Sequence, residues 1–172
     1  MEIIRYMFFI FILIGSTSIG FILSKSYTYR IKELNELLKL INIMQNKIKF
    51  TRKPLAEVLE ETSKIKEETN ISNIFLITST ELKKQKIEDS WKKGVNETKN
   101  TLNLNKNDIN LILTLGNVLG KTDVEGQISE INQFSSLLKT QITEAIEEKN
   151  KNAKMYKSLG TLIGLAIIII LF

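Results

Sequence analysis

The sequence predicts an all-α protein in which an antiparallel bundle of about six helices lies between an N-terminal and a C-terminal transmembrane helix. Three observations lead to this fold class. Each end of the 172-residue chain is an apolar run, and only one proline and eight glycines interrupt it. Between the runs, apolar residues recur at the helical spacings of three and four. The predicted divisions are a span over 1–24, a helical domain over 25–154 and a second span over 155–172.

The N-terminal run is long enough to cross a bilayer. Between Ile3 and Leu23 only Arg5 is charged, and about 20 residues rising 1.5 Å each cross a hydrocarbon core of about 30 Å. A cleaved signal peptide is the competing interpretation, because a charged start, an apolar run and small residues such as Gly15 and Gly20 imitate its regions. The basic residues that follow resist translocation and favour a retained helix.

Positive charge flanks both apolar runs on the side of the central segment. The flanking residues are Lys25, Arg30 and Lys32 after the first run, and Lys149, Lys151, Lys154 and Lys157 before the second. Cytoplasmic flanks of membrane helices carry the Lys and Arg excess. The central segment is therefore expected in the cytoplasm.

The C-terminal run is shorter, so its anchor must include the residues that precede it. The range 159–172 would reach only about 21 Å as a helix. Lys157 is expected to extend its ammonium group toward the headgroups, and Tyr156 to lie at the interface. Gly160 and Gly164 have the small-xxx-small spacing of closely packed membrane helices.

Composition excludes several classes of site. With no Cys and no His, the chain has no disulfide scaffold, no Cys or His zinc site and no His-based acid–base catalysis. The densest basic group, Lys83, Lys84 and Lys86, lacks the interleaved aromatic residues of a single-strand nucleic-acid groove. A solvated face near an anionic membrane is the preferred interpretation. No cofactor, metal, nucleic acid or small-molecule substrate is predicted.

The first four bundle helices follow from periodicity and punctuation. An apolar stripe predicts a helix over 27–50 that continues from the first span. Pro54 suits a first helical turn, so a second helix over 55–65 is expected to run back beside the first. Asn70 and Ser72 are cap candidates for a third helix. A short fourth segment contains Trp91, interpreted as a core anchor, with an exposed interface residue as the alternative.

The last two helices meet at a marked turn. Asn107 is the expected cap of a fifth helix that ends at Gly120, where a left-handed residue is favoured. Asp123 is expected to cap the sixth helix by accepting from the amide of Glu125 or Gly126, and this helix should continue into the second span. The turn superficially resembles a phosphate loop, but it lacks the GxxxxGK[ST] spacing and follows no strand. A helix stop and start is therefore preferred.

Three acid pairs are candidates for proton-transfer or metal chemistry. They are Glu60 with Glu61, Glu67 with Glu68, and Glu147 with Glu148. Neighbouring residues point about 100° apart on a helix, so they do not readily share a proton or a metal ion. General acid–base work also needs a concave, desolvating pocket. Solvated helix faces are the preferred interpretation.

Three groups of residues carry a resemblance to a known family. They are the run Tyr156, Lys157, Ser158, Leu159, Gly160 before the apolar tail, the turn LGKTDVEGQ from Leu119 to Gln127, and the helix with Arg30, Glu33, Leu34, Leu37 and Leu40 followed by Pro54 and Leu55. Over the whole chain, the sequence resembles the stage III sporulation protein AB family. The polar, Asn-rich composition departs from the typical pattern.

The resemblance implies a specific role. The family belongs to the engulfment-stage complex of endospore-forming bacteria, thought to build a secretion-like channel between mother cell and forespore. Its helical domain is similar to the cytoplasmic domain of F-class platform proteins of type II secretion and type IV pili. This implies a non-enzymatic scaffold in the outer forespore membrane that faces the mother-cell cytoplasm and docks a secretion-type ATPase, stage III sporulation protein AA.

The expected docking residues lie at the turn: Gly120, Lys121, Thr122, Asp123 and Gln127. Two other classes stay open. One is a membrane-tethered adaptor or regulator outside any channel, and the other is a hydrolytic or lipid-modifying enzyme that uses Asp, Glu, Lys or Ser. Homo-oligomerisation stays open as well.

Overall fold

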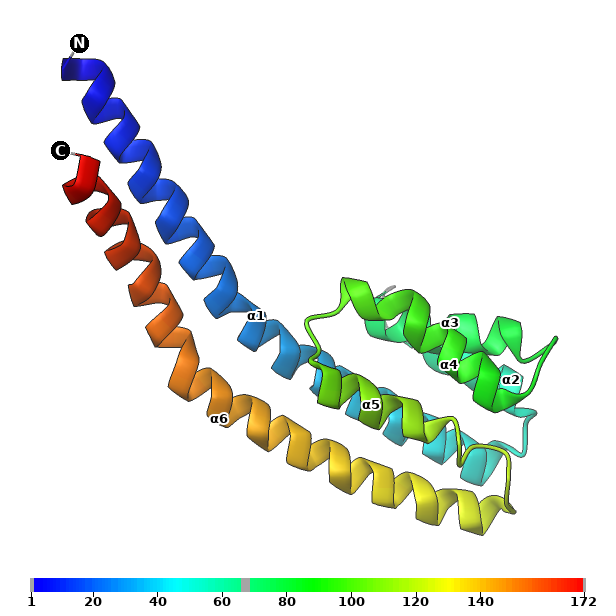
Figure 1. Ribbon diagram of the computed structural model, residues 1–172. Coiled ribbons are helices and arrows are strands. Elements are labelled where there is room, and N and C mark those ends of the chain that lie inside the picture. Colours follow the sequence, from blue (N-terminus) through cyan, green and yellow to red (C-terminus); the bar gives the residue numbers. More distant parts are fainter. Residues whose placement is uncertain (1, 66–68, 172) are drawn as a thin grey trace. The chain divides into compact units, whose positions relative to one another are not determined.

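The computed structural model describes residues 2–65 and 69–171, and the regular secondary structure of these residues is helical, with no strand. Six α-helices and one 3₁₀ helix follow one another over this part of the chain (Figure 1). Their bounds are α1 Glu2–Thr51, α2 Leu55–Ser63, α3 Asn70–Glu81, α4 Ile87–Thr98, η1 Lys99–Thr101, α5 Lys106–Leu115 and α6 Val124–Leu171. Long apolar helices at the two ends flank a helical bundle. The predicted fold class is confirmed.

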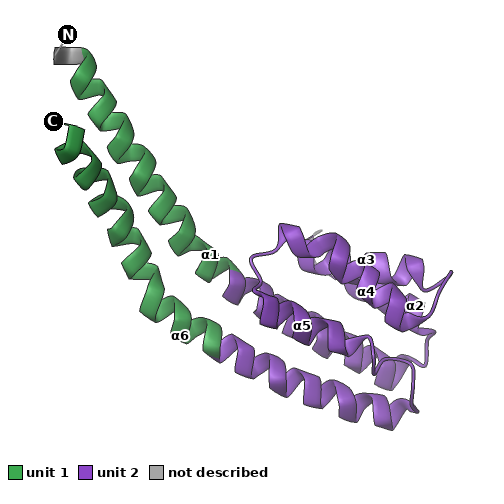
Figure 2. Ribbon diagram, viewed as in Figure 1, with its two compact units in different colours: residues 1–29, 144–172 green, residues 30–143 purple. Residues whose placement is uncertain are grey.

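The chain divides into two compact units (Figure 2). Unit 1 consists of Met1–Tyr29 with Glu144–Phe172, and unit 2 of Arg30–Thr143. α1 and α6 each contribute to both units, and neither is interrupted at the boundary. This confirms that the first and last bundle helices continue from the terminal apolar segments.

The core of unit 2 is built from the apolar stripes that the sequence shows. On α1 the stripe is fully or almost fully buried at Leu34, Leu37, Leu40, Ile41, Met44 and Ile48. α6 supplies Ile131, Phe134 and Leu138. The two helices are neighbours in this unit, because Gln45 Nε2 donates to Ile128 O at 3.2 Å and to Asn132 Oδ1 at 2.7 Å.

Trp91 is a core anchor, as predicted. Its side chain is 0% exposed. Its ring meets the ring of Phe75 edge to face, with 5.4 Å between centroids, and its Nε1 donates to Ile112 O at 2.7 Å. A Cβ on Gly116 would lie 2.9 Å from the Trp91 side chain. Trp91 therefore joins α3, α4 and α5 and leaves no polar group unpaired.

Two predicted caps were wrong by one or two positions. α3 is capped by Thr69 instead of Asn70: its hydroxyl accepts from Ser72 N at 3.0 Å, and Ser72 Oγ accepts from Thr69 N at 2.8 Å. α5 is capped by Asn105 instead of Asn107, through a reciprocal pair of bonds with Asp108. In both cases the capping box, which satisfies two amides at once, selects the cap among adjacent polar residues.

α5 also ends earlier than predicted. Its last residue is Leu115. The next residues form a tighter turn with hydrogen bonds between residues three apart, from Asn117 N to Thr114 O and from Val118 N to Leu115 O. Gly120 has the expected left-handed conformation, with φ of +71°, but it lies within the connection to α6. α2 ends at Ser63.

A buried ion pair joins α1 to the start of α5. Arg30 Nε donates to Asp108 Oδ2 at 2.7 Å and Arg30 Nη2 to Oδ1 at 3.1 Å. The Asp108 side chain is 0% exposed and that of Arg30 is 5% exposed. Asp108 Oδ2 also accepts from Asn105 N at 2.9 Å. This bidentate geometry satisfies both carboxylate oxygens, which offsets the cost of burying the charges.

A carboxylate on α1 holds the connection before α5. Glu33 accepts from Asn103 N at 2.7 Å and from Asn103 Nδ2 at 2.8 Å. Burial raises the pKa of Glu33 above its usual value, and the two Asn103 hydrogen bonds oppose the increase. The side chains of Arg30 and Glu33 therefore fix where the segment from η1 to α5 lies against α1.

Removal of one partner of the buried pair should destabilise unit 2. Asp108→Ala removes the buried carboxylate that accepts two hydrogen bonds from the Arg30 guanidinium, so we expect a loss of about 3–5 kcal/mol. Replacement of both residues, Arg30→Met with Asp108→Leu, should recover most of that loss, because no buried charge remains. Chemical unfolding of the full-length chain in detergent, followed by the fluorescence of its single tryptophan, measures both. Equal losses in both variants would contradict this account.

The end of α1 stores backbone strain. Arg52 has φ of +50°, a conformation that costs a non-glycine residue roughly 1 kcal/mol. We expect Arg52→Gly to be about 1 kcal/mol more stable than Arg52→Ala, which removes the same charge but keeps the strain. The same unfolding assay compares them, and equal stabilities would show that the strain is absent in solution.

Candidate functional site

The predicted docking turn connects α5 to α6 and is held by the side chain of Gln127. Gln127 Oε1 accepts from Gly120 N at 3.2 Å, and its Nε2 donates to Thr122 O at 3.0 Å. Asp123 Oδ1 accepts from Gly126 N at 3.0 Å, which confirms Asp123 as the cap of α6. Three of the five predicted residues, Gly120, Asp123 and Gln127, therefore shape the turn.

The other two predicted residues present their side chains outward. Lys121 and Thr122 are both exposed. Lys121 Nζ lies 3.3 Å from Glu88 Oε2, and both side chains of this pair are about half exposed, so the contact contributes little to stability. A Cβ on Gly120 would lie 3.7 Å from both Ile87 and Leu55. The turn thus lies beside the first residues of α2 and α4.

The acid pairs that the structure describes take part in surface ion pairs or face outward. Glu61 binds both Lys47 and Lys53, and hydrogen bonds from Lys47 and Lys53 lower the pKa of its carboxyl to about 2. Glu60 lies 2.6 Å from Lys64 Nζ, and the bond from Lys64 lowers its pKa. Both carboxylates are therefore ionised at neutral pH and unsuited to donate a proton.

The remaining acid pairs add no site. Glu147 and Glu148 are exposed on α6, whereas Glu67 and Glu68 lie outside the described residues. Over the described part of the chain, no group of three or more carboxylates is placed to hold a metal ion.

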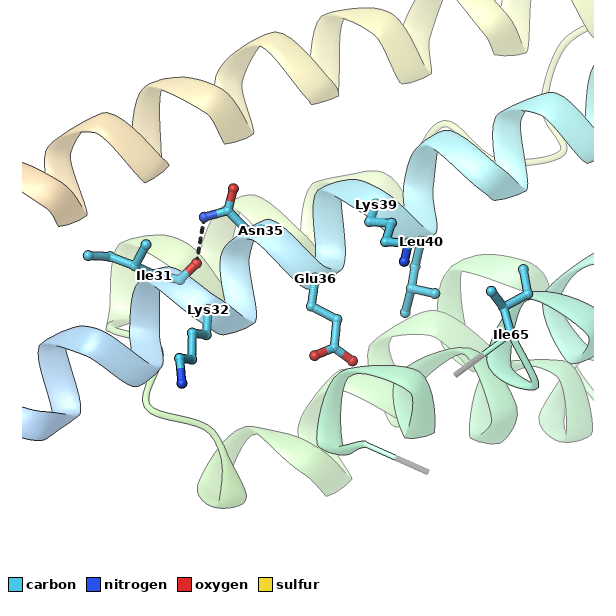
Figure 3. A pocket seen from close by; sticks show the side chains of 7 residues that line it. All are labelled: Ile31, Lys32, Asn35, Glu36, Lys39, Leu40 and Ile65. Carbon is cyan, nitrogen blue, oxygen red and sulfur yellow. Dashed lines mark hydrogen bonds between the residues drawn. The ribbon is translucent and has the colours of Figure 1, made fainter. Parts of the chain in front are cut away.

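A hollow of about 450 Å³ lies along α1 in unit 2 (Figure 3). Its lining is Ile31, Lys32, Asn35, Glu36, Lys39, Leu40 and Ile65. Glu36 is the one carboxylate in that lining and accepts from the hydroxyl of Thr69, while Asn35 Nδ2 donates to Ile31 O at 2.8 Å. Among the described residues, the lining offers no pair of carboxylates for a hydrolytic site, and Glu67 and Glu68 lie outside those residues.

In unit 1 the two terminal helices approach each other through small residues. A Cβ on Gly20 would lie 2.9 Å from Gly160 Cα, and a Cβ on Gly160 would lie 2.7 Å from Ser16 O. A Cβ on Gly164 would lie 2.1 Å from Ser16 Oγ. Ser16 and Gly20 on α1 thus match Gly160 and Gly164 on α6. A larger residue at Gly20 or Gly160, where the neighbouring atoms are backbone, would force the helices apart. Gly15 faces open space.

Aromatic and basic residues of unit 1 lie next to this contact. The rings of Tyr27 and Tyr156 stack with 5.9 Å between centroids. Lys157 Nζ lies 5.7 Å from the centre of the Phe21 ring. Such amphipathic side chains are typical of the boundary between lipid and water.

The outer surface of unit 1 is apolar. α1 and α6 are each long and apolar enough to cross a membrane. Only 6% of the most apolar 18-residue segment of α1 is buried, and 11% of that of α6. Large side chains point outward, such as Phe11 at 70% exposed and Ile170 at 83%. Contiguous apolar exposure of this extent marks a membrane or protein contact.

Comparisons with known proteins agree on one family. The family model of stage III sporulation protein AB matches residues 5–172. Stage III sporulation protein AB of Bacillus subtilis (strain 168) is 27% identical over 164 residues, covering 94% of this chain and 95% of that protein. A solved structure of stage III sporulation protein AB matches with a TM-score of 0.66 and 18% identity, covering 72% of this chain and 98% of that one. The structural likeness concerns the fold.

The glycine contact gives a test of helix packing in unit 1. The chain has no cysteine, and a Cβ at position 164 would lie 3.2 Å from Ser16 Cβ, close to the separation of about 3.8 Å in disulfides. Oxidation of Ser16→Cys with Gly164→Cys should therefore cross-link α1 to α6. Adding Gly160→Leu should abolish the cross-link, whereas Gly15→Leu should not. Equal yields with both leucines would contradict the contact.

Proposed function

The chain belongs to the stage III sporulation protein AB family, and we propose that it is a non-enzymatic platform of the stage III channel between mother cell and forespore. In this proposal 1–24 and 155–172 cross the outer forespore membrane. The helical domain, 25–154, faces the mother-cell cytoplasm, docks the ATPase stage III sporulation protein AA and associates with other stage III proteins. The observation that carries the proposal is the family match over residues 5–172.

The surface of unit 1 supports the membrane spans. Each fully exposed Phe, Ile or Leu side chain forgoes roughly 1.5–3 kcal/mol of transfer free energy in water. An outward apolar surface on both helices is therefore stable only in a bilayer or against a partner. The contact between Gly20 and Gly160 supports a retained N-terminal helix over a cleaved signal peptide.

Lysines at the end of each span support the orientation. Lys25 on α1 and Lys154 and Lys157 on α6 lie on the side of each span that leads to unit 2. The excess of basic residues on cytoplasmic flanks then favours a cytoplasmic unit 2.

The connections between the units suit a platform. α1 and α6 pass from one unit to the other as unbroken helix, and no Gly- or Pro-rich linker intervenes. Flexible linkers absorb displacement, whereas helical segments pass it on. Motion imposed on the domain by a motor would thus reach the spans.

The turn between α5 and α6 supports a docking role. Gln127 and Asp123 hold its backbone, so the backbone at the exposed Lys121 and Thr122 would lose little conformational freedom on binding. An adaptor or regulator outside any channel is the alternative, because it would share the spans and the bundle. An enzyme is disfavoured because the chain has no Cys and no His.

Purification from sporulating cells tests the proposal. The tagged full-length chain should retain the AA ATPase and other mother-cell stage III proteins in detergent, as identified by mass spectrometry. Lys121→Glu should reduce ATPase recovery about tenfold, the equivalent of about 1.4 kcal/mol, and leave recovery of the membrane proteins unchanged. Lys139→Glu, an exposed charge reversal on α6, serves as the control.

Two results would change the conclusion. Isolation of the chain without partners would favour the independent adaptor. Unchanged ATPase recovery with Lys121→Glu would remove the turn as the docking surface while leaving the platform in place.

A further inference from the structure

We propose that the beginning of the C-terminal span carries a binding site for the phosphate headgroup of an anionic membrane lipid. The site consists of Lys154, Lys157, Ser158 and Thr161 on α6, with Leu162 beneath them. It rests on the proposed function only in that α6 crosses the membrane. It requires neither the channel nor the ATPase.

These residues surround one hollow. It has a volume of about 420 Å³, and its lining is Lys154, Lys157, Ser158, Thr161 and Leu162. Residues three, four and seven positions apart share one face of a helix. Two ammonium groups and two hydroxyl groups therefore converge on the same surface, and no carboxylate is among the lining residues.

The donors of this face have no anionic or hydrogen-bonding partner in the described part of the chain. Neither Lys154 nor Lys157 has a salt bridge there, and the hydroxyls of Ser158 and Thr161 make no hydrogen bond there. On α2, by contrast, Lys64 pairs with Glu60 at 2.6 Å. The positions three and four residues from each lysine of the site contain no acid, so the helix itself supplies no counterion.

α1 adds positive charge at the same level of unit 1. The Phe21 ring has Lys157 Nζ at 5.7 Å and Lys25 Nζ at 6.0 Å from its centre. Cation–π contacts of this kind hold an ammonium without neutralising it. The site is therefore a local excess of positive charge made by both helices.

The order of the residues along α6 favours a lipid over a free phosphate ion. The lysines come first, the hydroxyls next and Leu162 last, over nine residues or about 12 Å of helix. A phospholipid presents the same order, from anionic headgroup through ester oxygens to acyl chain. A headgroup with its own cation would meet repulsion from the lysines, so phosphatidylglycerol or cardiolipin fits better than phosphatidylcholine.

Lipid retention by the full-length chain in detergent tests the site, with native mass spectrometry as the readout. We expect phosphatidylglycerol to be retained over phosphatidylcholine. Lys154→Gln with Lys157→Gln should weaken phosphatidylglycerol binding about thirtyfold, since each lysine near an anionic surface contributes about a factor of five. Ser158→Ala with Thr161→Val, which changes no charge, should weaken it about fivefold.

The matched control changes the same charge on the same helix outside the hollow. If lipid binding depends on direct contact with the site, Lys149→Gln with Lys151→Gln should leave the affinity within about twofold of that of the unchanged chain. Equal losses in the two lysine pairs would overturn the site in favour of diffuse attraction. Displacement of the lipid by soluble glycerol phosphate would overturn the assignment to a lipid.

Failure of the site can be told apart from failure of the spans. If alkaline carbonate releases the unchanged chain from membranes, the spans and the site are both wrong. If the chain stays in the membrane but retains both lipids equally, only the site is wrong. Unchanged fluorescence of Trp91, which is buried in unit 2, shows that unit 2 stays folded in the variants. An unchanged yield of the cross-link between Ser16→Cys and Gly164→Cys shows that the helix contact of unit 1 is kept.

Discussion

The bidentate contact between Arg30 and Asp108 is the constraint on which the arrangement of unit 2 depends. Buried charges tolerate few alternative positions, because each lost hydrogen bond leaves an uncompensated charge. One carboxylate here accepts from both Arg30 and the amide of Asn105. The group that starts α5 is thus also the group that binds α1. Apolar burial holds the bundle together, but this pair specifies where the connection from α4 returns to the first helix.

Periodicity predicts most of this fold because most of its stability lies in apolar stripes. The stripe of α1, the turn at Pro54, the burial of Trp91 and the continuity of α6 all follow from residue spacing. The caps of α3 and α5 depend instead on a reciprocal partner three residues later, which decides between adjacent polar residues. The ion pair joins residues 78 apart in the chain, and no local pattern marks such a pair.

The candidate sites show the same division between local and distant information. The sequence predicts the turn from Gly120 and Asp123. The hydrogen bonds from the Gln127 side chain to the backbone of Gly120 and Thr122 could not be predicted, because they depend on the path of the folded chain. Gly160 and Gly164 are visible as a spacing, whereas their partners on α1 follow only from the register of two helices. The lysines before the second span indicate orientation by their number. That two of these lysines, Lys154 and Lys157, meet two hydroxyl groups at one hollow is known only from the surface of the folded helix.

The pairing of α1 with α6 has a consequence for synthesis. Gln45, next to the stripe residue Met44 on α1, bonds to a helix that begins at Val124, so this part of α1 lacks that neighbour until α6 has been synthesised. At about 5–20 residues per second, roughly 100 residues take about 5–20 s. During that time the N-terminal span can already reside in the bilayer while this part of α1 still lacks that neighbour. The nascent chain therefore has a window for aggregation or chaperone binding that closes only when its last bundle helix leaves the ribosome.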